Sequence, residues 1–150
     1  MRTRLSRQKG VAAVEMGIVL IPLVVLVFGI TELGRAFYQY NTLAKGTRDA
    51  ARFLSAQGPG DPNDVAIAQC MVVYGNGTCT GSPLVPGLAT SQVSVCDSTN
   101  CPGNLAQPTG SEVINLVTVS VVGYAFTSVV PFVVPSLTFN DISTTMRQVL

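Results

Sequence analysis

The sequence predicts an α+β fold in which one long N-terminal helix packs against a small antiparallel β-sheet domain. Three observations lead to this prediction: an apolar run near the N-terminus, a helical periodicity that continues beyond it, and β-branched segments in the second half of the chain. The 150 residues suffice for one modest domain with an attached segment. We therefore divide the chain into residues 1–10, 11–31, 32–57 and 61–150.

The first two parts are a basic tail and an apolar run. Residues 1–10 contain four cations and no acidic side chain, and the twenty residues from Val11 to Ile30 carry a single charge, Glu15. A helix of that length spans about 30 Å, which matches the hydrocarbon core of a bilayer. We expect residues 1–10 to form a cytoplasmic leader and residues 11–31 to form a transmembrane helix.

A secretory signal peptide and a plain membrane anchor are two simpler interpretations of the apolar run. A cleaved secretory signal peptide has a shorter apolar region followed by a small-x-small site, and the nearest such site, Gly34-Arg35-Ala36, contains an arginine. A plain membrane anchor is compatible with Pro22, because membrane helices tolerate proline. The plain anchor leaves Glu15 unexplained.

Glu15 lies inside the apolar run, where a charge costs about 2.5–3.5 kcal/mol at the helix centre and less near the interface. A cut between Gly10 and Val11 would create a protonated α-amino group at Val11. This amine and Glu15 would share one helix face, about 6 Å apart along the axis. Glu15 would then pair with its own Val11 amine, favour the positive end of its helix, or pair with the amine of another subunit.

The run Gly10-Val11-Ala12-Ala13-Val14-Glu15, with Pro22 farther on, resembles the processing motif of type IV prepilins. It is most similar to the start of the TadE-like family, which contains pseudopilins or minor pilins of the tight adherence (Flp-type) pilus apparatus. The likeness continues through residues 28–37 and 50–52, whereas Met16 stands where an aromatic residue often follows the glutamate.

The resemblance implies a pilin-like fold and cleavage after Gly10 by a membrane aspartyl prepilin peptidase. It also implies that Glu15 meets an N-terminal amine when subunits dock. The implied partners are the peptidase, other pilin or pseudopilin subunits and the pilus assembly platform.

The helix is predicted to continue as an amphipathic extension through residues 32–57. Its apolar residues recur every three or four positions, as in Leu33, Phe37, Tyr40, Leu43, Ala50, Ala51 and Leu54. Phe37, Tyr38 and Tyr40 follow the span by one to two turns, so they either form an interfacial aromatic belt or pack under the globular part. Gly58-Pro59-Gly60 ends the helix.

The third part of the chain predicts a short helix followed by strands. Asp61-Pro62 supplies a helix N-cap and a first-turn proline, so residues 64–74 are expected to be helical. Strands are expected at residues 92–96 and 112–122, where β-branched residues alternate with polar ones. Residues 126–134 and 137–146 are two further candidates, although Pro131 and Pro135 confine the first to a sheet edge or break it.

Four cysteines indicate the compartment of the domain. Cys70, Cys79, Cys96 and Cys101 are separated by gaps unlike the CxxC spacing of zinc sites. Two disulfides are therefore favoured, and they imply an oxidising periplasm or cell exterior. Four cysteines allow three connectivities, of which we favour the local pairing of Cys70 with Cys79 and of Cys96 with Cys101.

The charge distribution complements the cysteines. Basic groups flank both sides of the span almost equally, so the positive-inside rule leaves the orientation nearly tied. The cysteines and the acidic C-terminal part break this tie in favour of a cytoplasmic N-terminus and a periplasmic domain. We expect a single-pass protein of the bacterial inner membrane.

The composition excludes several functional classes. The chain has no histidine, which rules out Ser-His-Asp and Cys-His catalysis and His-ligated zinc, and its net charge of +1 offers no basic excess for nucleic acid. We expect no enzyme, no metal and no cofactor. The expected function is that of a TadE-like minor pilin or pseudopilin; the alternative is an unprocessed, membrane-tethered periplasmic module that binds or adheres through the loops around Cys96 to Cys101.

Overall fold

The computed structural model describes residues 8–110 and 112–149. Within these residues it contains helices α1 (Gln8–Ser55) and α2 (Pro62–Tyr74), two short 3-10 turns, and the strands β1 (Val93–Cys96), β2 (Gln107–Pro108), β3 (Val113–Val121), β4 (Ala125–Phe126), β5 (Leu137–Thr138) and β6 (Ile142–Gln148). A long N-terminal helix and a small antiparallel sheet are both present, which confirms the predicted α+β class.

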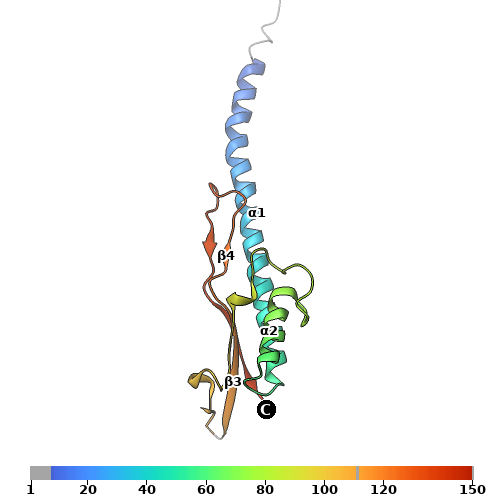
Figure 1. The fold of residues 1–150 in the computed structure, drawn as a ribbon. Coiled ribbons are helices and arrows are strands. Elements are labelled where there is room, and N and C mark those ends of the chain that lie inside the picture. The colour runs from blue at the N-terminus through green and yellow to red at the C-terminus, as the bar shows by residue number, and fades with distance from the viewer. Residues whose placement is uncertain (1–7, 111, 150) are drawn as a thin grey trace, which may run out of the picture.

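Helix α1 is one uninterrupted element of 48 residues, even though it contains Pro22. Its first part projects away from the rest of the molecule as an isolated helix, whereas the domain packs along its second part (Figure 1). The projecting part is apolar and long enough to cross a membrane, and none of its most apolar window is buried. This helix indicates a single-pass membrane protein.

Strand β3 lies at the centre of the larger sheet. Strand β6 pairs with it along one edge, from Asn115↔Gln148 to Val121↔Ile142. The shorter strands β1 and β2 pair with opposite ends of β3 along its other edge. Because side chains alternate across a strand, the valines at 117, 119 and 121 all face inward and are buried.

The core lies between this sheet, α2 and the second part of α1. Its buried members come from all three layers and include Leu43, Ala51, Val72, Val73, Val119 and Val121. Helices α1 and α2 approach closely at Gly46, where an added Cβ would lie 3.2 Å from the carbonyl oxygen of Val72. The small residues of α1 thus let α2 pack against its backbone.

Helix α2 forms where the sequence predicts it, with its first turn beginning at Pro62. The Asp61 carboxylate accepts a hydrogen bond from the N–H of Asn63 at 2.8 Å, as an N-cap does. Gly75 ends the helix in the left-handed conformation (φ 73°), and its N–H donates to the carbonyl of Met71.

Two strand predictions are corrected by the structure. Residues 126–134 do not form a strand: only Phe126 pairs, as part of β4, and the following residues turn back as a loop. The prolines 131 and 135 lack the N–H groups that a ladder needs. The segment 137–146 divides into β5 and β6; between them the Phe139 ring packs against three other aromatic rings, and its N–H donates to the Tyr124 carbonyl at 2.9 Å. The two-residue strand β2 was not predicted.

The structure tests one of the two roles expected for the aromatic residues after the span, packing under the globular part. Phe37 and Tyr38 are 59% and 69% exposed, whereas the ring of Tyr40 packs edge-on against Phe139 with centroids 5.8 Å apart. Tyr40, itself 45% exposed, therefore contacts the globular part, and an interfacial belt of Phe37 and Tyr38 stays a prediction.

Candidate functional site

The residues singled out by the sequence at the N-terminus all lie on α1. Gly10 and Val11 belong to its first turns, and Val11 and Glu15 are exposed. Their spacing of four positions places Val11 and Glu15 on one helix face. An added Cβ at Gly10 would meet no atom within 4 Å, and within the described part of the chain no ion pair reaches Glu15. This end of the helix is free of contacts with the domain.

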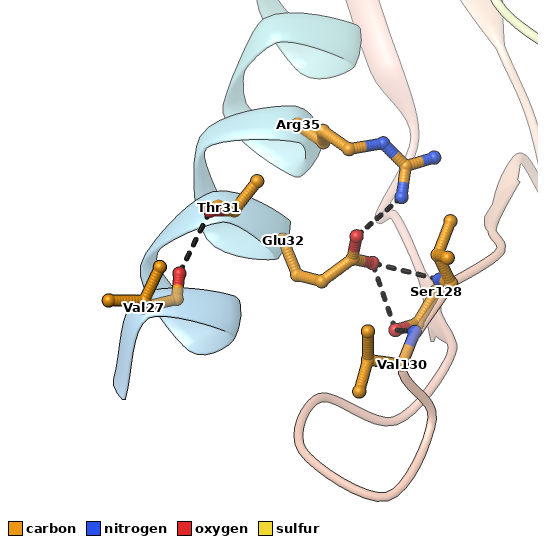
Figure 2. A network of polar contacts seen from close by, with 7 residues as sticks. Val27, Thr31, Glu32, Arg35, Ser128 and Val130 are labelled. Carbon is orange, nitrogen blue, oxygen red and sulfur yellow. Dashed lines mark hydrogen bonds and ion pairs between the residues drawn. The ribbon is translucent and has the colours of Figure 1, made fainter. Parts of the chain in front are cut away.

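A second carboxylate, which the sequence analysis did not single out, is buried just after the span. Glu32 is 3% exposed, and its side chain is held from two elements (Figure 2). Arg35 donates to one carboxylate oxygen at 2.6 Å. The Ser128 hydroxyl and the Val129 N–H donate to the other oxygen at 2.9 and 3.0 Å. Such charge-assisted bonds to a buried carboxylate are stronger than neutral ones.

The contacts continue along the same face of α1. The guanidinium of Arg35 lies over the Phe126 ring, 5.4 Å from its centroid, in a cation–π arrangement. One turn farther, the hydroxyl of Tyr124 lies 2.9 Å from the side-chain oxygen of Gln39 and from the carbonyl oxygen of Pro86. Burial raises the pKa of Tyr124, and the positive charge of Arg35 lowers it in part, so Tyr124 remains a neutral donor at physiological pH. These contacts thus hold the β4–β5 pair against α1, above the main sheet.

The cysteines are joined in two local disulfides. Cys70 is bonded to Cys79 and Cys96 to Cys101, with Cα atoms 4.8 and 5.5 Å apart. This is the pairing favoured from the sequence. The first disulfide ties α2 to the loop that follows it, and the second closes the turn after β1.

Asp97, inside the second disulfide loop, connects that loop to the segment between α1 and α2. One of its carboxylate oxygens accepts hydrogen bonds from Thr99 and Asn100, and the other accepts the N–H of Gly60 at 2.9 Å. Burial raises the pKa of Asp97, but these hydrogen bonds outweigh it and hold the pKa below its ordinary value. The Cys96–Cys101 loop is therefore fixed on the domain through a carboxylate whose oxygens are already hydrogen-bonded.

The two carboxylates of α1 differ in what the sequence reveals. Glu15 interrupts an apolar run, so the sequence identifies it directly. Glu32 stands at the end of that run beside polar neighbours, and its partner Ser128 lies 96 positions away. The only local signal is Arg35 at spacing i+3, which also occurs in ordinary surface pairs.

The described residues offer few groups for other kinds of site, such as a metal site or a charged binding site. Within residues 8–110 and 112–149, no three metal-ligating side chains come together. A shallow groove runs between α1 and α2 and is lined by Tyr38, Thr42, Lys45, Asp49, Met71 and Leu84. It is open to solvent, and its cations and acids are dispersed.

An exposed apolar helix that is long enough to cross a membrane continues directly into a small, disulfide-bonded α+β domain, an arrangement typical of a membrane-anchored protein. The family model described as TadE-like protein matches residues 10–52. This match confirms the resemblance seen in the sequence and supports a structural protein associated with the tight adherence pilus. It covers the span and its extension, and residues 53–150 lie outside it. No curated protein and no solved structure matches the chain.

Proposed function

We propose that this chain is a TadE-like minor pilin or pseudopilin, cleaved after Gly10 by a prepilin peptidase, that supports the assembly, initiation or capping of a tight adherence pilus. The carrying observation is that the family match begins at Gly10, includes Glu15 and ends at Arg52, within the helical extension. The exposed position of all three motif residues on α1 supports the same function.

The proposal assigns a place to each part of the chain. Residues 1–10 form the cytoplasmic leader, residues 11–31 span the bacterial inner membrane, residues 32–57 carry the helix outward, and residues 61–150 form the periplasmic domain. The two disulfides support this orientation, because they require an oxidising compartment. The finished subunit would either stay in the membrane platform or enter an extracellular pilus.

Processing can be tested at the new N-terminus. Mass spectrometry of the protein from the bacterial envelope is expected to find Val11 as the first residue. Gly10→Val should block the cut, whereas Gly17→Val, a matched change in the same exposed helix, should not; a Cβ added at either position has no atom of another element within 4 Å. An intact Met1 in the wild-type protein would contradict the proposal and favour an unprocessed, tethered binding module.

The role of Glu15 needs a separate experiment. The cut places a protonated amine at Val11, and the exposed Glu15 carboxylate is available either to this amine or to the amine of an incoming subunit. If Glu15 docks subunits, Glu15→Ala leaves processing intact and abolishes piliation. Glu15→Asp, which keeps the charge, should retain part of the assembly, and normal piliation of Glu15→Ala would exclude a docking role.

A further inference from the structure

The loop between β4 and β5 reaches back along α1 to the end of the apolar run. The Val129 N–H donates to Glu32 at 3.0 Å, and the Val133 side chain lies 3.6 Å from the position of a Cβ added to Gly29. Gly29 belongs to the apolar segment itself. Figure 1 shows this loop lying beside the helix, well above the level of the main sheet. A part of the domain thus extends to the depth at which the membrane begins.

The tip of this loop is apolar and carries no charge. Every residue from Val129 to Val134 is apolar, and no charged residue occurs between Glu112 and Asp141. Phe132 is 80% exposed and Val129 is 71% exposed. Among the described residues, no other large apolar side chain is as exposed as Phe132. Such a patch on a soluble surface marks an interaction site.

The backbone of the tip is suited to apolar surroundings, where an unpaired polar group is costly. The N–H groups of Val133 and Val134 both donate to the carbonyl of Val130, and the Val130 N–H donates to the Ser128 hydroxyl. Pro131 and Pro135 have no N–H to satisfy. The loop therefore presents side chains outward while it keeps most of its own donors paired.

We propose that residues 129–134 enter the interfacial layer of the membrane beside α1 and form a second, shallow membrane contact. The loop surface is continuous with the exposed apolar surface of the spanning helix at Gly29. Glu32 lies directly beneath the tip and fixes its height, because its carboxylate binds both Arg35 on the helix and Ser128 in the loop. The inference requires that α1 spans the membrane and does not depend on the pilus function.

The absence of tryptophan from the chain makes the contact measurable. Phe132→Trp in the full-length protein gives one tryptophan at the tip. The protein is reconstituted in vesicles of phosphatidylethanolamine and phosphatidylglycerol, with quenchers either dissolved in water or attached to the lipids. Leu105→Trp places the same residue at an exposed apolar position on the far end of the domain, and Val19→Trp places it inside the span. Flotation with the vesicles confirms insertion of each variant.

The expected result is a blue-shifted emission for Phe132→Trp that lipid-attached quenchers reduce, with a depth between those of the other two variants. A Phe132→Trp emission that matches Leu105→Trp would overturn the proposal. A blue shift that disappears when the protein is diluted in excess lipid would also overturn it, since a second copy of the chain would then cover the loop. Adding Glu32→Gln to Phe132→Trp should weaken the lipid quenching, because the tip loses its support.

Discussion

The carboxylate of Glu32 joins two segments that are 96 positions apart in the chain. Burying a charge is costly unless it is paired and hydrogen-bonded, and here Arg35, Ser128 and Val129 supply the partners. The buried carboxylate therefore stabilises the fold only while these partners are in place. Removing one partner leaves a buried group unsatisfied, which costs more than the net value of the bond it made.

A double-mutant cycle tests this coupling. Glu32→Gln and Ser128→Ala are each expected to destabilise the domain, and their combination should cost less than the sum of the two single losses. The measurement is urea unfolding of the full chain in detergent micelles. Thr42→Ala, which removes an exposed hydroxyl from the same helix, controls for helix effects. Additive losses would show that Glu32 and Ser128 do not interact in solution.

Asp97 makes the stability depend on pH. Its pKa is lowered in the folded protein, so the unfolded chain takes up its proton first as the pH falls. The stabilisation by the ionised carboxylate is complete above the ordinary pKa of about 4 and is lost below it, as the pH falls through the lowered folded-state pKa. Stability should accordingly fall more steeply with acid in the wild type than in Asp97→Asn.

The check compares the unfolding free energies of wild type and Asp97→Asn from neutral pH down to about pH 3. Near neutrality Asp97→Asn should be less stable than the wild type by about 1–3 kcal/mol. This difference in unfolding free energy should become smaller in acid. Asp61→Asn removes the same charge but keeps a competent N-cap, so it serves as the matched control. A gap that is constant over this range would contradict the role given to Asp97.

Helices α1 and α2 pack closely because α1 has no side chain at Gly46. A Cβ there would lie 3.2 Å from the Val72 carbonyl oxygen and 3.3 Å from the Val72 Cα, both backbone atoms. Gly46→Leu should therefore destabilise the domain by about 1–3 kcal/mol through overpacking. Gly34→Leu, on an open part of the same helix, should be close to neutral. Thermal unfolding in micelles measures both, and equal melting temperatures would show that the helices separate readily.

The elements themselves were largely predictable from local signals. Periodicity indicated α1, Asp61-Pro62 indicated α2, and the alternation of valines with polar residues indicated β3, each of which the structure contains. The segment after Phe126 could not be predicted in the same way. Its β-branched residues satisfy a strand pattern, whereas its conformation is determined by the distant carboxylate of Glu32 and by the prolines.

The candidate site was predictable in unequal parts. Gly10, Val11 and Glu15 form a contiguous motif, so the sequence alone identified it and the family match covers it. The network of Glu32 required knowledge of which distant loop lies over the helix, and no spacing in the sequence contains that information. The disulfides Cys70–Cys79 and Cys96–Cys101 could be predicted because cysteines that are close in the chain are also close in space.

Processing would change the charge of the whole molecule. Loss of Arg2, Arg4, Arg7 and Lys9 leaves five basic against eight acidic side chains, so the formal charge moves from +1 to −3. Isoelectric focusing of the envelope protein should show the mature form at a lower isoelectric point than Gly10→Val. Equal isoelectric points would indicate that the leader is retained in the wild type.

The hydrogen bond between Glu32 and Ser128 can form only after most of the chain has been synthesised. The helix enters the membrane first, and the residues that cover Glu32 are made 96 positions later. At about 5–20 residues per second, roughly 5–20 s pass between the synthesis of Glu32 and that of its loop partners Ser128 and Val129. During that interval the loop that covers the Glu32 face of the helix has not yet been made. A chain that stops before residue 128 would therefore keep the Arg35 contact of Glu32 but lack both donors from the loop.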